Sequence, residues 1–271
     1  MRSQPQGLQR IMKRNSSKIM EEYFERLLSS QRLVVLTGAG VSTLSGIPDF
    51  RGANGFYANG DTWRGYNKEE LLDIDFISTR WELFYQFANE QLYPMLSKEP
   101  CVVHKLCYEL ERIGKLRTLF TQNIDSLHFK AGNKKVVELH GSLDRFICTR
   151  CGEGFSYSKI GGEASDSGVP HCPNCGGILR PDVVFYGENL GEGIERAHLE
   201  FRDADMVLVM GTSLTVYPVA SLPMLSYQND GEIIIVNAQP TSMDKYALTR
   251  FTDLGEFCSQ FLTYIANTSN I

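Results

Sequence analysis

The sequence predicts an α/β fold in which a doubly wound parallel sheet carries a small inserted lobe. Short apolar runs alternate with longer stretches of helical periodicity, which is the order of crossover units in a parallel sheet. Two Cys-x-x-Cys pairs interrupt this alternation and indicate a separate metal-binding insertion. We expect residues 17–145 and 182–271 to form the sheet domain and residues 146–181 to form the inserted module.

The bulk composition is that of an ordinary globular protein. The chain has 271 residues, of which 42% are hydrophobic and 22% are charged, enough for one large domain with a smaller lobe. The formal net charge of −5 argues against a general nucleic-acid binder, which relies on neutralising phosphates. No apolar run approaches the roughly 20 residues that a membrane helix needs, so we expect no membrane association through a spanning helix.

Residues 1–16 are expected to form a flexible basic tail. Every charged residue before Glu21 is a lysine or an arginine. This composition also suits an organellar presequence, which is basic and poor in acids. Because we interpret the segment as a tail, we expect a cytoplasmic protein. A mitochondrial location is the alternative if the segment is a presequence.

The secondary structure follows from the period of the apolar residues. Ser17 is a candidate N-cap for the first helix, and Gly114 a candidate end for a later one. Residues 52–73 are rich in Gly, Asn and Asp and are expected to form a mobile loop with one short helix near 68–72. The predicted strands are 33–37, 117–121, 136–139, 183–186, 206–210 and 232–236. The predicted helices are 17–28, 75–95, 103–113, 125–131, 193–202, 218–227 and 254–265.

The first predicted strand ends in Gly38-Ala39-Gly40, a small-residue turn of the kind that binds phosphate after a buried strand. Glycine there lets backbone N–H groups approach a pyrophosphate closely. Thr43 stands where a dinucleotide fingerprint has its third glycine, so the turn by itself also suits an ordinary tight turn. Arg51 follows and supplies a fork-shaped cation for a phosphate.

Four of the seven cysteines occur in two tight pairs, twenty residues apart. This spacing is typical of a tetrahedral zinc site, and four thiolates leave no open position for water. The sequence therefore predicts a structural Zn²⁺ in a reducing compartment; a redox dithiol, or His171 as a competing ligand, is the alternative. The predicted ligands are Cys148, Cys151, Cys172 and Cys175. The other cysteines are expected to pack in the core: Cys101, Cys107 and Cys258.

Further polar residues follow other predicted strands at their carboxyl ends, where parallel sheets bind ligands. Asn123 and Asp125 follow one strand, although both also suit a helix cap. His140 follows the next strand, and an imidazole titrates near neutral pH and can act as a base, although a lone histidine is more often structural. His104 and His128 fall in helical segments and are expected to be structural.

The continuation of the glycine turn, Ser45-Gly46-Ile47-Pro48-Asp49-Phe50-Arg51, resembles the cofactor loop of the sirtuins, the NAD-dependent protein deacylases. The remaining motifs follow in the order of that family between Leu27 and Phe261. The resemblance implies a Rossmann-like domain with NAD⁺ as co-substrate and a zinc ribbon inserted at the position of the cysteine pairs. Ser126 departs from the pattern, because many family members have glycine there.

The resemblance also implies roles for single residues. His140 is the implied catalytic base, with Asn123 beside the nicotinamide ribose and Asp125 at the nicotinamide carboxamide. The implied cofactor-binding residues are Gly38, Ala39, Gly40, Ser42, Asp49, Phe50, Arg51, Gln122, Asn123, Ile124, Asp125, Gly211, Thr212, Ser213 and Asn237. The residues expected to pair with a substrate strand and to line an acyl-lysine tunnel are Val184, Phe185, Tyr186 and Gly187.

The implied activity transfers the acyl group of an acyl-lysine protein or peptide to ADP-ribose and releases nicotinamide. Phe84 and Phe87 stand where family members that prefer dicarboxylic acyl groups carry Tyr and Arg. An acidic acyl tail would be buried unpaired, so we expect acetyl or other uncharged acyl groups. The alternatives are a mono-ADP-ribosyltransferase or NAD glycohydrolase on the same scaffold, a dehydrogenase, and a non-catalytic zinc-ribbon adaptor.

Overall fold

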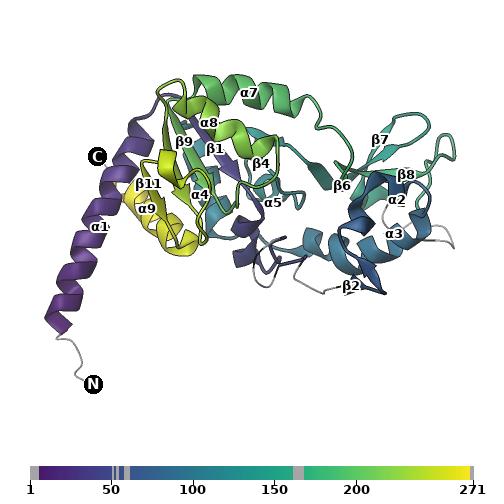
Figure 1. Cartoon of the computed structure of the whole chain (residues 1–271), viewed down its shortest axis with the longest axis horizontal. Coiled ribbons are helices and arrows are strands. Elements are labelled where there is room, and N and C mark those ends of the chain that lie inside the picture. Colours follow the sequence, from purple (N-terminus) through teal and green to yellow (C-terminus); the bar gives the residue numbers. More distant parts are fainter. Residues whose placement is uncertain (1–5, 51, 53–54, 58–61, 161–167, 269–271) are drawn as a thin grey trace.

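A six-stranded parallel sheet forms the larger part of the molecule (Figure 1). The computed structural model describes residues 6–50, 52, 55–57, 62–160 and 168–268, with side chains from Lys18 onward. The strand order is β11-β10-β9-β1-β4-β5, and every pairing is parallel, as predicted for a doubly wound sheet. The strands are β1 (Leu33–Thr37), β4 (Leu116–Thr121), β5 (Val136–Glu138), β9 (Met206–Met210), β10 (Glu232–Val236) and β11 (Thr249–Phe251).

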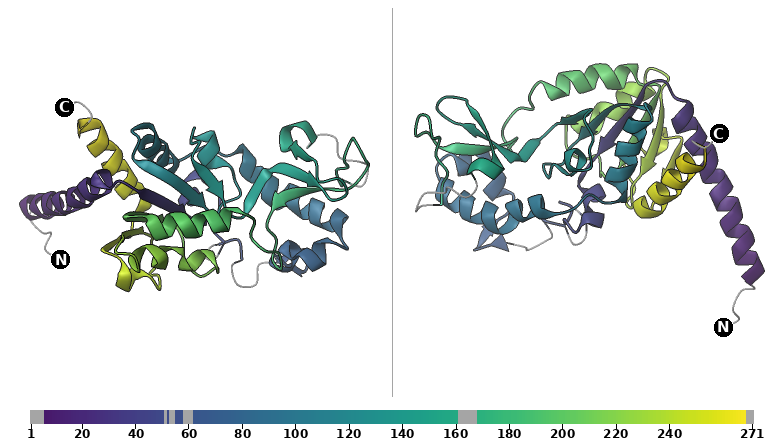
Figure 2. Two further views of the ribbon diagram at one scale, coloured as in Figure 1. Left: turned by 90° about the horizontal axis from the view of Figure 1, so that it is seen from above. Right: turned by 180° about the vertical axis from the view of Figure 1, so that it is seen from behind.

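Helices cover both faces of this sheet, as the views in Figure 2 show. Successive side chains of a strand point to opposite faces, so Leu33 and Val35 lie in one buried cluster while Val34 and Leu36 lie in the other. The helices on the first face are α1 (Gln6–Ser29), α4 (Val102–Arg112) and α9 (Leu254–Thr268). Those on the second face are α7 (Gly193–Asp203) and α8 (Leu222–Tyr227).

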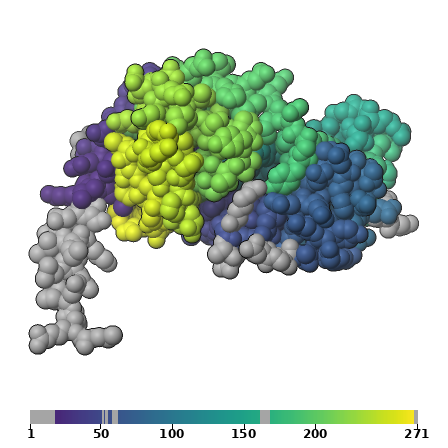
Figure 3. Space-filling model, in the orientation of Figure 1, coloured from purple at the N-terminus to yellow at the C-terminus, as the bar shows by residue number. Residues whose placement is uncertain are grey.

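The remainder forms what we call the small lobe, made of residues 141–183 together with residues 62–97. Its antiparallel sheet has the order β7-β6-β8, with strands β6 (Gly141–Cys148), β7 (Gly154–Ser156) and β8 (Leu179–Val183), and α6 (Tyr157–Ile160) follows β7. The sheet begins before and ends after the predicted module 146–181. In the space-filling view the small lobe, blue to teal, adjoins the sheet domain (Figure 3).

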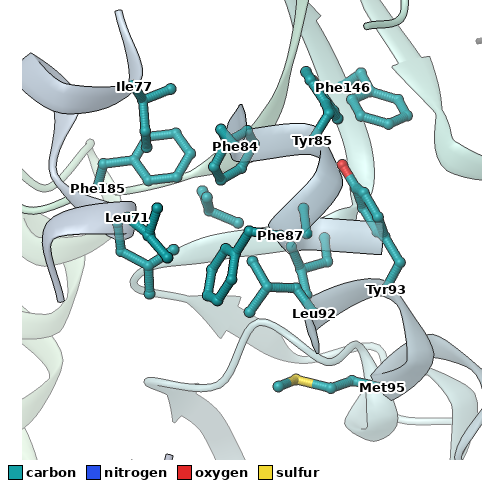
Figure 4. Packing of buried hydrophobic residues seen from close by; sticks show 14 of the residues in the cluster. Leu71, Ile77, Phe84, Tyr85, Phe87, Leu92, Tyr93, Met95, Phe146 and Phe185 are labelled. Carbon is teal, nitrogen blue, oxygen red and sulfur yellow. The ribbon is translucent and has the colours of Figure 1, made fainter. Parts of the chain in front are cut away.

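The second segment of the small lobe consists of short elements. It contains the hairpin β2 (Thr62–Trp63) and β3 (Tyr66–Asn67), a 3₁₀ turn (Glu70–Leu72), α2 (Ile74–Ile77), α3 (Trp81–Phe87), a π-helical turn (Ala88–Leu92) and a 3₁₀ turn (Tyr93–Ser97). Phe84, Phe87 and Phe146 are buried in one aromatic cluster that joins both segments (Figure 4). The lobe is therefore held by contacts between distant parts of the chain as well as by its cysteines.

Two predictions about single elements are wrong, and several short strands, β11 among them, were not predicted. The single helix expected over 75–95 is broken between Ser78 and Arg80, and the break lets Ile77 and Phe84 both enter the aromatic cluster. The strand expected at 183–186 lies earlier, at β8, because pairing with β6 selects that segment. β11 was not expected, since its three residues are too few to show a period.

The first helix begins at Gln6 rather than at Ser17, so much of the segment expected to be a flexible tail has helical backbone. Between Pro5 and Ser17 the sequence is rich in Leu, Ile, Met, Gln, Lys and Arg, which favour helix, and their combined propensity outweighs one candidate cap. Residues 1–5 lie outside the described part. No helix among the described residues is both long enough and apolar enough to span a membrane.

Candidate active site

A cavity of about 690 Å³ lies at the carboxyl ends of β1, β4, β9 and β10, between the sheet and the small lobe. This is the edge of a parallel sheet where ligands bind, and the volume suits a cofactor. Nearly all described residues that the sequence assigns to cofactor, substrate or catalysis line it. They are Gly38, Ala39, Gly40, Asp49, Phe50, Gln122, Asn123, Ile124, His140, Val184, Phe185, Tyr186, Gly187, Gly211, Thr212, Ser213 and Asn237.

The glycine turn lines the cavity and is held by the end of β9 and by the loop that follows it. The N–H of Gly38 donates to Met210 O at 3.1 Å, and that of Gly40 donates to Gly211 O at 2.8 Å. A Cβ on Gly40 would lie 2.8 Å from Gly211 O, so glycine is required for the approach of two loops. Among the backbone N–H groups of this turn, those of Gly38 and Gly40 are therefore used within the protein.

Asn123 combines a fixed amide with an unsatisfied oxygen. Its Nδ2 donates to Ser42 Oγ at 3.0 Å, and Gln122 Nε2 donates to Thr212 Oγ1 at 2.9 Å. Among the described residues nothing donates to the buried Asn123 Oδ1. A buried acceptor on a cavity wall is suited to a ligand hydroxyl, which supports the fit of a ribose there.

Ser42 and Asp125 lie behind the cavity wall rather than on it. Ser42 donates to one oxygen of Asp125 at 2.6 Å, and the Leu127 N–H donates to the other at 2.9 Å. Burial raises the pKa of Asp125. Ser126, which stands where many family members have glycine, has a φ of +59°, in the left-handed region that favours glycine.

His140 occupies the start of the connection from β5 into the small lobe. Its Nδ1 lies 2.9 Å from Gln122 O, and its own carbonyl accepts from the Val184 N–H at 2.9 Å. Because a carbonyl only accepts, Nδ1 carries the hydrogen and Nε2 carries the lone pair of the neutral ring. The ring is therefore set up to take a proton at Nε2.

The segment expected to bind substrate is partly paired with the chain itself. Tyr186 N–H donates to Leu72 O at 2.9 Å, and its carbonyl accepts from Ile74 N–H at 3.0 Å. Phe185 is buried edge-on against Phe84, with ring centroids 5.4 Å apart. The predicted tunnel thus has an aromatic wall that belongs to the small lobe.

The loop after β1 closes the other side. Phe50 packs against Tyr57 with ring centroids 5.4 Å apart, and Asp49 Oδ1 accepts from the Gly52 N–H at 2.8 Å. Arg51, predicted to bind phosphate, lies outside the described residues.

Sequence reasoning missed several lining residues because isolated apolar or amide side chains carry no pattern. They are Tyr57, Leu72, Glu188, Asn189, Leu190, Ile194, Val216, Tyr217, Pro218 and Gln239. The available signal in the sequence was an aromatic residue directly before a proline, in Val216-Tyr217-Pro218. The structure places Tyr217 beside the cavity, where it is 73% exposed.

The four paired cysteines converge in the small lobe. Their Sγ atoms all lie within 4.8 Å of one another, and the Sγ atoms of Cys148 and Cys175 are 3.4 Å apart. Zn–S bonds of ordinary length place tetrahedral sulfurs about 3.8 Å apart, so the set fits Zn²⁺. Backbone N–H groups, that of Cys151 foremost, lower the pKa of Cys148, whereas neighbouring thiols contribute to a raised pKa of Cys151 and Cys175. His171 instead contacts Gly176 O at 3.3 Å.

Fold and site together define a dinucleotide-binding protein of Rossmann-like architecture with an inserted zinc lobe. A model described as the Sir2 family matches residues 38–218. A Thermotoga maritima protein named NAD-dependent protein deacetylase is 40% identical over 245 residues, which are 90% of this chain and 97% of that protein. The chain belongs to the Sir2 family, as the sequence resemblance predicted.

Two solved structures support the same conclusion. One is Sir2 with a deacetylated p53 peptide and 3′-O-acetyl ADP-ribose, with a TM-score of 0.82 at 39% identity over 90% of this chain and 98% of that one. Another is Sir2Tm bound to a propionylated peptide, with a TM-score of 0.79 at 35% identity over 92% of this chain and 98% of that one.

Proposed function

We propose that this chain removes acetyl and other uncharged acyl groups from lysine side chains, with His140 as general base. The chain is an NAD-dependent protein deacylase, and the alternative of a mono-ADP-ribosyltransferase or NAD glycohydrolase is not favoured by its relatives. The observation that carries the role of His140 is its Nδ1 contact with Gln122 O, which assigns the lone pair to Nε2 on a cavity wall.

Bound NAD⁺ supplies a ribose that accepts the acyl group when nicotinamide leaves. His140 takes a proton from a ribose hydroxyl at Nε2, and Asn123 Oδ1 orients the sugar by accepting a hydrogen bond. Phe50, whose ring lies over Tyr57, keeps water from the reacting face. The Zn²⁺ holds the small lobe and takes no part in the reaction, since all four ligands are protein sulfurs.

Replacement of His140 tests the role of the base. We expect His140→Ala to lower kcat about 10²- to 10⁴-fold, since general base catalysis contributes that much. His198→Ala, on the exposed surface of α7, is the matched control and should leave kcat unchanged. The measurement is mass spectrometry of an acetyl-lysine peptide with and without NAD⁺, following free lysine and acetyl-ADP-ribose. Equal rates for both variants would rule out His140 as the base.

The preference for uncharged acyl groups follows from the cavity wall. No described lining residue is a lysine or arginine, and the carboxylate of Glu188 is paired with Arg180 at 2.6 Å. Phe84 and Phe87 are both fully buried in the aromatic cluster. A carboxylate at the end of the acyl chain would lose its hydration with no described cation to replace it.

Butyryl-lysine and succinyl-lysine peptides provide a matched test, because both acyl groups have four carbons and differ by the carboxylate. We expect kcat/KM to be at least about 100-fold higher for the butyryl peptide. Burial of the succinyl carboxylate without a cation costs roughly 3 kcal/mol, and that energy corresponds to this ratio. Comparable values would contradict the proposed preference and leave the deacylase reaction itself unaffected.

The proposed partners are acyl-lysine proteins or peptides, without direct nucleic-acid binding, and the proposed location is the cytoplasm. The reduced thiols of a zinc site favour a reducing compartment. A mitochondrial location is the alternative if the basic N-terminal segment is a presequence. Fractionation of cells that express the tagged chain, with and without residues 1–16, separates the two.

A further inference from the structure

Two buried histidines lie directly behind the glycine turn of the cavity. His104 belongs to α4 and His128 belongs to α5 (Leu127–Lys130), and both side chains are at most 2% exposed. Their ring centroids are 4.7 Å apart with an angle of 55° between the planes. Neither residue lines the cavity or has a part in the proposed reaction.

Each histidine connects to one end of the glycine turn. His128 Nε2 lies 3.0 Å from the hydroxyl of Thr37, the last residue of β1. The Cys101 thiol donates its one hydrogen to Val41 O at 3.2 Å. Its sulfur packs 3.1 Å from His104 Nδ1, which accepts from the backbone N–H of the same cysteine. Thr37 and Val41 are the residues immediately before and after Gly38-Ala39-Gly40.

Thr37 also joins the turn to the loop that carries Asn123. Thr37 O accepts from the Gln122 N–H at 2.9 Å, while the Thr37 hydroxyl contacts His128 in the helix that follows this loop. Displacement of Thr37 would therefore shift two walls of the cavity together.

Both rings are neutral near pH 7. Burial lowers the pKa of His104 to about 4 and lowers that of His128 well below its usual value. The N–H of Cys101 donates to His104 Nδ1 at 3.2 Å, so the hydrogen of this ring is on Nε2. Within the described part of the chain, His104 Nε2 and His128 Nδ1 are buried without a hydrogen-bond partner.

Two buried imidazoles with unsatisfied nitrogens cost stability, and apolar side chains of similar size would fill the same space without that cost. Stability accounts for the hydrogen bond from the Cys101 N–H to His104, which caps α4, and leaves the other contacts of the two rings to be explained. Those contacts fix both ends of a loop whose backbone must approach the neighbouring loop closely.

We propose that His104 and His128 are positioning residues that hold the glycine turn, through Cys101 and Thr37, in the conformation that binds NAD⁺. The inference rests on the proposed function in that it takes the turn to be part of the NAD⁺ site. Loss of these contacts should weaken NAD⁺ binding and leave binding of the acyl-lysine peptide unchanged.

The test compares variants at both ends of this chain of contacts. We expect Thr37→Val and His128→Phe each to raise the KM and Kd for NAD⁺ about tenfold, the upper effect of one buried hydrogen bond, with an unchanged KM for acetyl-lysine peptide. Thr37→Ser keeps the hydroxyl and should stay within about twofold of the wild type. Cys101→Ala should raise the KM for NAD⁺ about threefold, because its contacts are made by a weaker sulfur donor.

Cys258→Ala is the matched control, since this buried residue packs in the same cluster of α4 and α9 and, among the described residues, its side chain makes no hydrogen bond to the turn. It should lower the melting temperature without changing the KM for NAD⁺. The proposal is overturned if Thr37→Val and His128→Phe behave like Cys258→Ala, or if they raise both KM values together. If His128→Phe does not fold, Thr37→Val, which exchanges one hydroxyl for a methyl group, decides alone.

Direct NAD⁺ binding by calorimetry separates this proposal from the proposed function. A wild-type chain that binds NAD⁺ without deacylating the peptide contradicts the function, whereas the variants still report on the histidines through Kd.

Discussion

The two walls of the cavity are held by different kinds of contact. On the sheet side, backbone atoms hold backbone atoms, as when Gly40 N–H donates to Gly211 O and Gly211 N–H donates to Val236 O. On the small-lobe side, aromatic side chains hold one another, as Phe84 holds Phe185. The closest approach on the first wall is therefore set by chain geometry, although Asn123 and Gln122 add side-chain hydrogen bonds there. The second wall depends mainly on side-chain identity, although the backbone of Tyr186 is also paired there.

This difference matches the two ligands of the reaction, the dinucleotide on the sheet side and the acylated peptide on the small-lobe side. A dinucleotide is the same in every turnover, and a wall made of backbone suits an unvarying ligand. The acyl group and its peptide differ among substrates, and a wall of side chains changes its shape through substitution without disturbing the sheet.

Removal of zinc should have the largest effect, confined to the small lobe. Structural zinc contributes on the order of 10 kcal/mol to small domains, so chelation should unfold β6, β7 and β8 and abolish peptide deacylation. Hydrogen exchange should show lost protection in residues 141–183, with β1 and β9 still protected. Equal loss of protection in the parallel sheet would mean that the two parts do not fold separately.

Truncation of one buried phenylalanine in each part should separate stability from activity. Phe84→Ala and Phe257→Ala should each lower the free energy of unfolding by about 3–5 kcal/mol, since both rings are fully buried. Only Phe84→Ala should also raise the KM for acyl-lysine peptide, because Phe84 supports Phe185 on the cavity wall. Denaturant unfolding measures the stability of both variants, and kinetics below their melting temperatures measure the KM for the peptide. A KM that rises equally in both variants would contradict a specific role of Phe84 at the cavity wall.

Acid should destabilise the sheet domain through its buried histidine. The folded pKa of His104 is about 4 and its ordinary value is 6.5, so between these pH values the unfolded chain binds a proton that the folded chain does not. Stability is therefore present above pH 6.5 and is lost as pH falls towards 4, by on the order of 3 kcal/mol.

His104→Phe isolates this contribution from the other titrating groups. Glu138 acts with the opposite sign, because burial raises its pKa to about 7 and stability is lost as pH rises through that value. Glu138 is present in both wild type and His104→Phe, so its contribution cancels when the unfolding free energy of one is subtracted from that of the other. Urea unfolding at pH 7, 6 and 5 should show a shallower pH dependence in the variant, and identical slopes would contradict a neutral buried His104.

Part of the fold could be read from local pattern. The strands at Leu33–Thr37, Met206–Met210 and Glu232–Val236 occur where expected, because each is a continuous apolar run between polar residues. β8 could not be read in this way, since it contains Arg180, Pro181 and Asp182, and its pairing with β6 is what makes it a strand.

The site residues likewise include some that local sequence pattern indicates and some whose placement depends on the folded structure. His140 and Asn123 drew attention by their position at strand ends and received their roles from the family resemblance, and both line the cavity. The four cysteines were predicted from their spacing, and their sulfurs converge. Ser42 and Asp125, in contrast, contact each other behind the cavity wall, which follows from the depth at which two separate loops meet.

The sequence by itself determined which residues follow the strands and which sulfurs form a ligand set, because both depend on period and spacing within short segments. The tertiary structure alone decided that the N–H groups of Gly38 and Gly40 donate to Met210 and Gly211 and that His104 lies against His128. Those relations join residues far apart in the chain, and only packing of the folded sheet brings them within hydrogen-bonding or ring-contact distance.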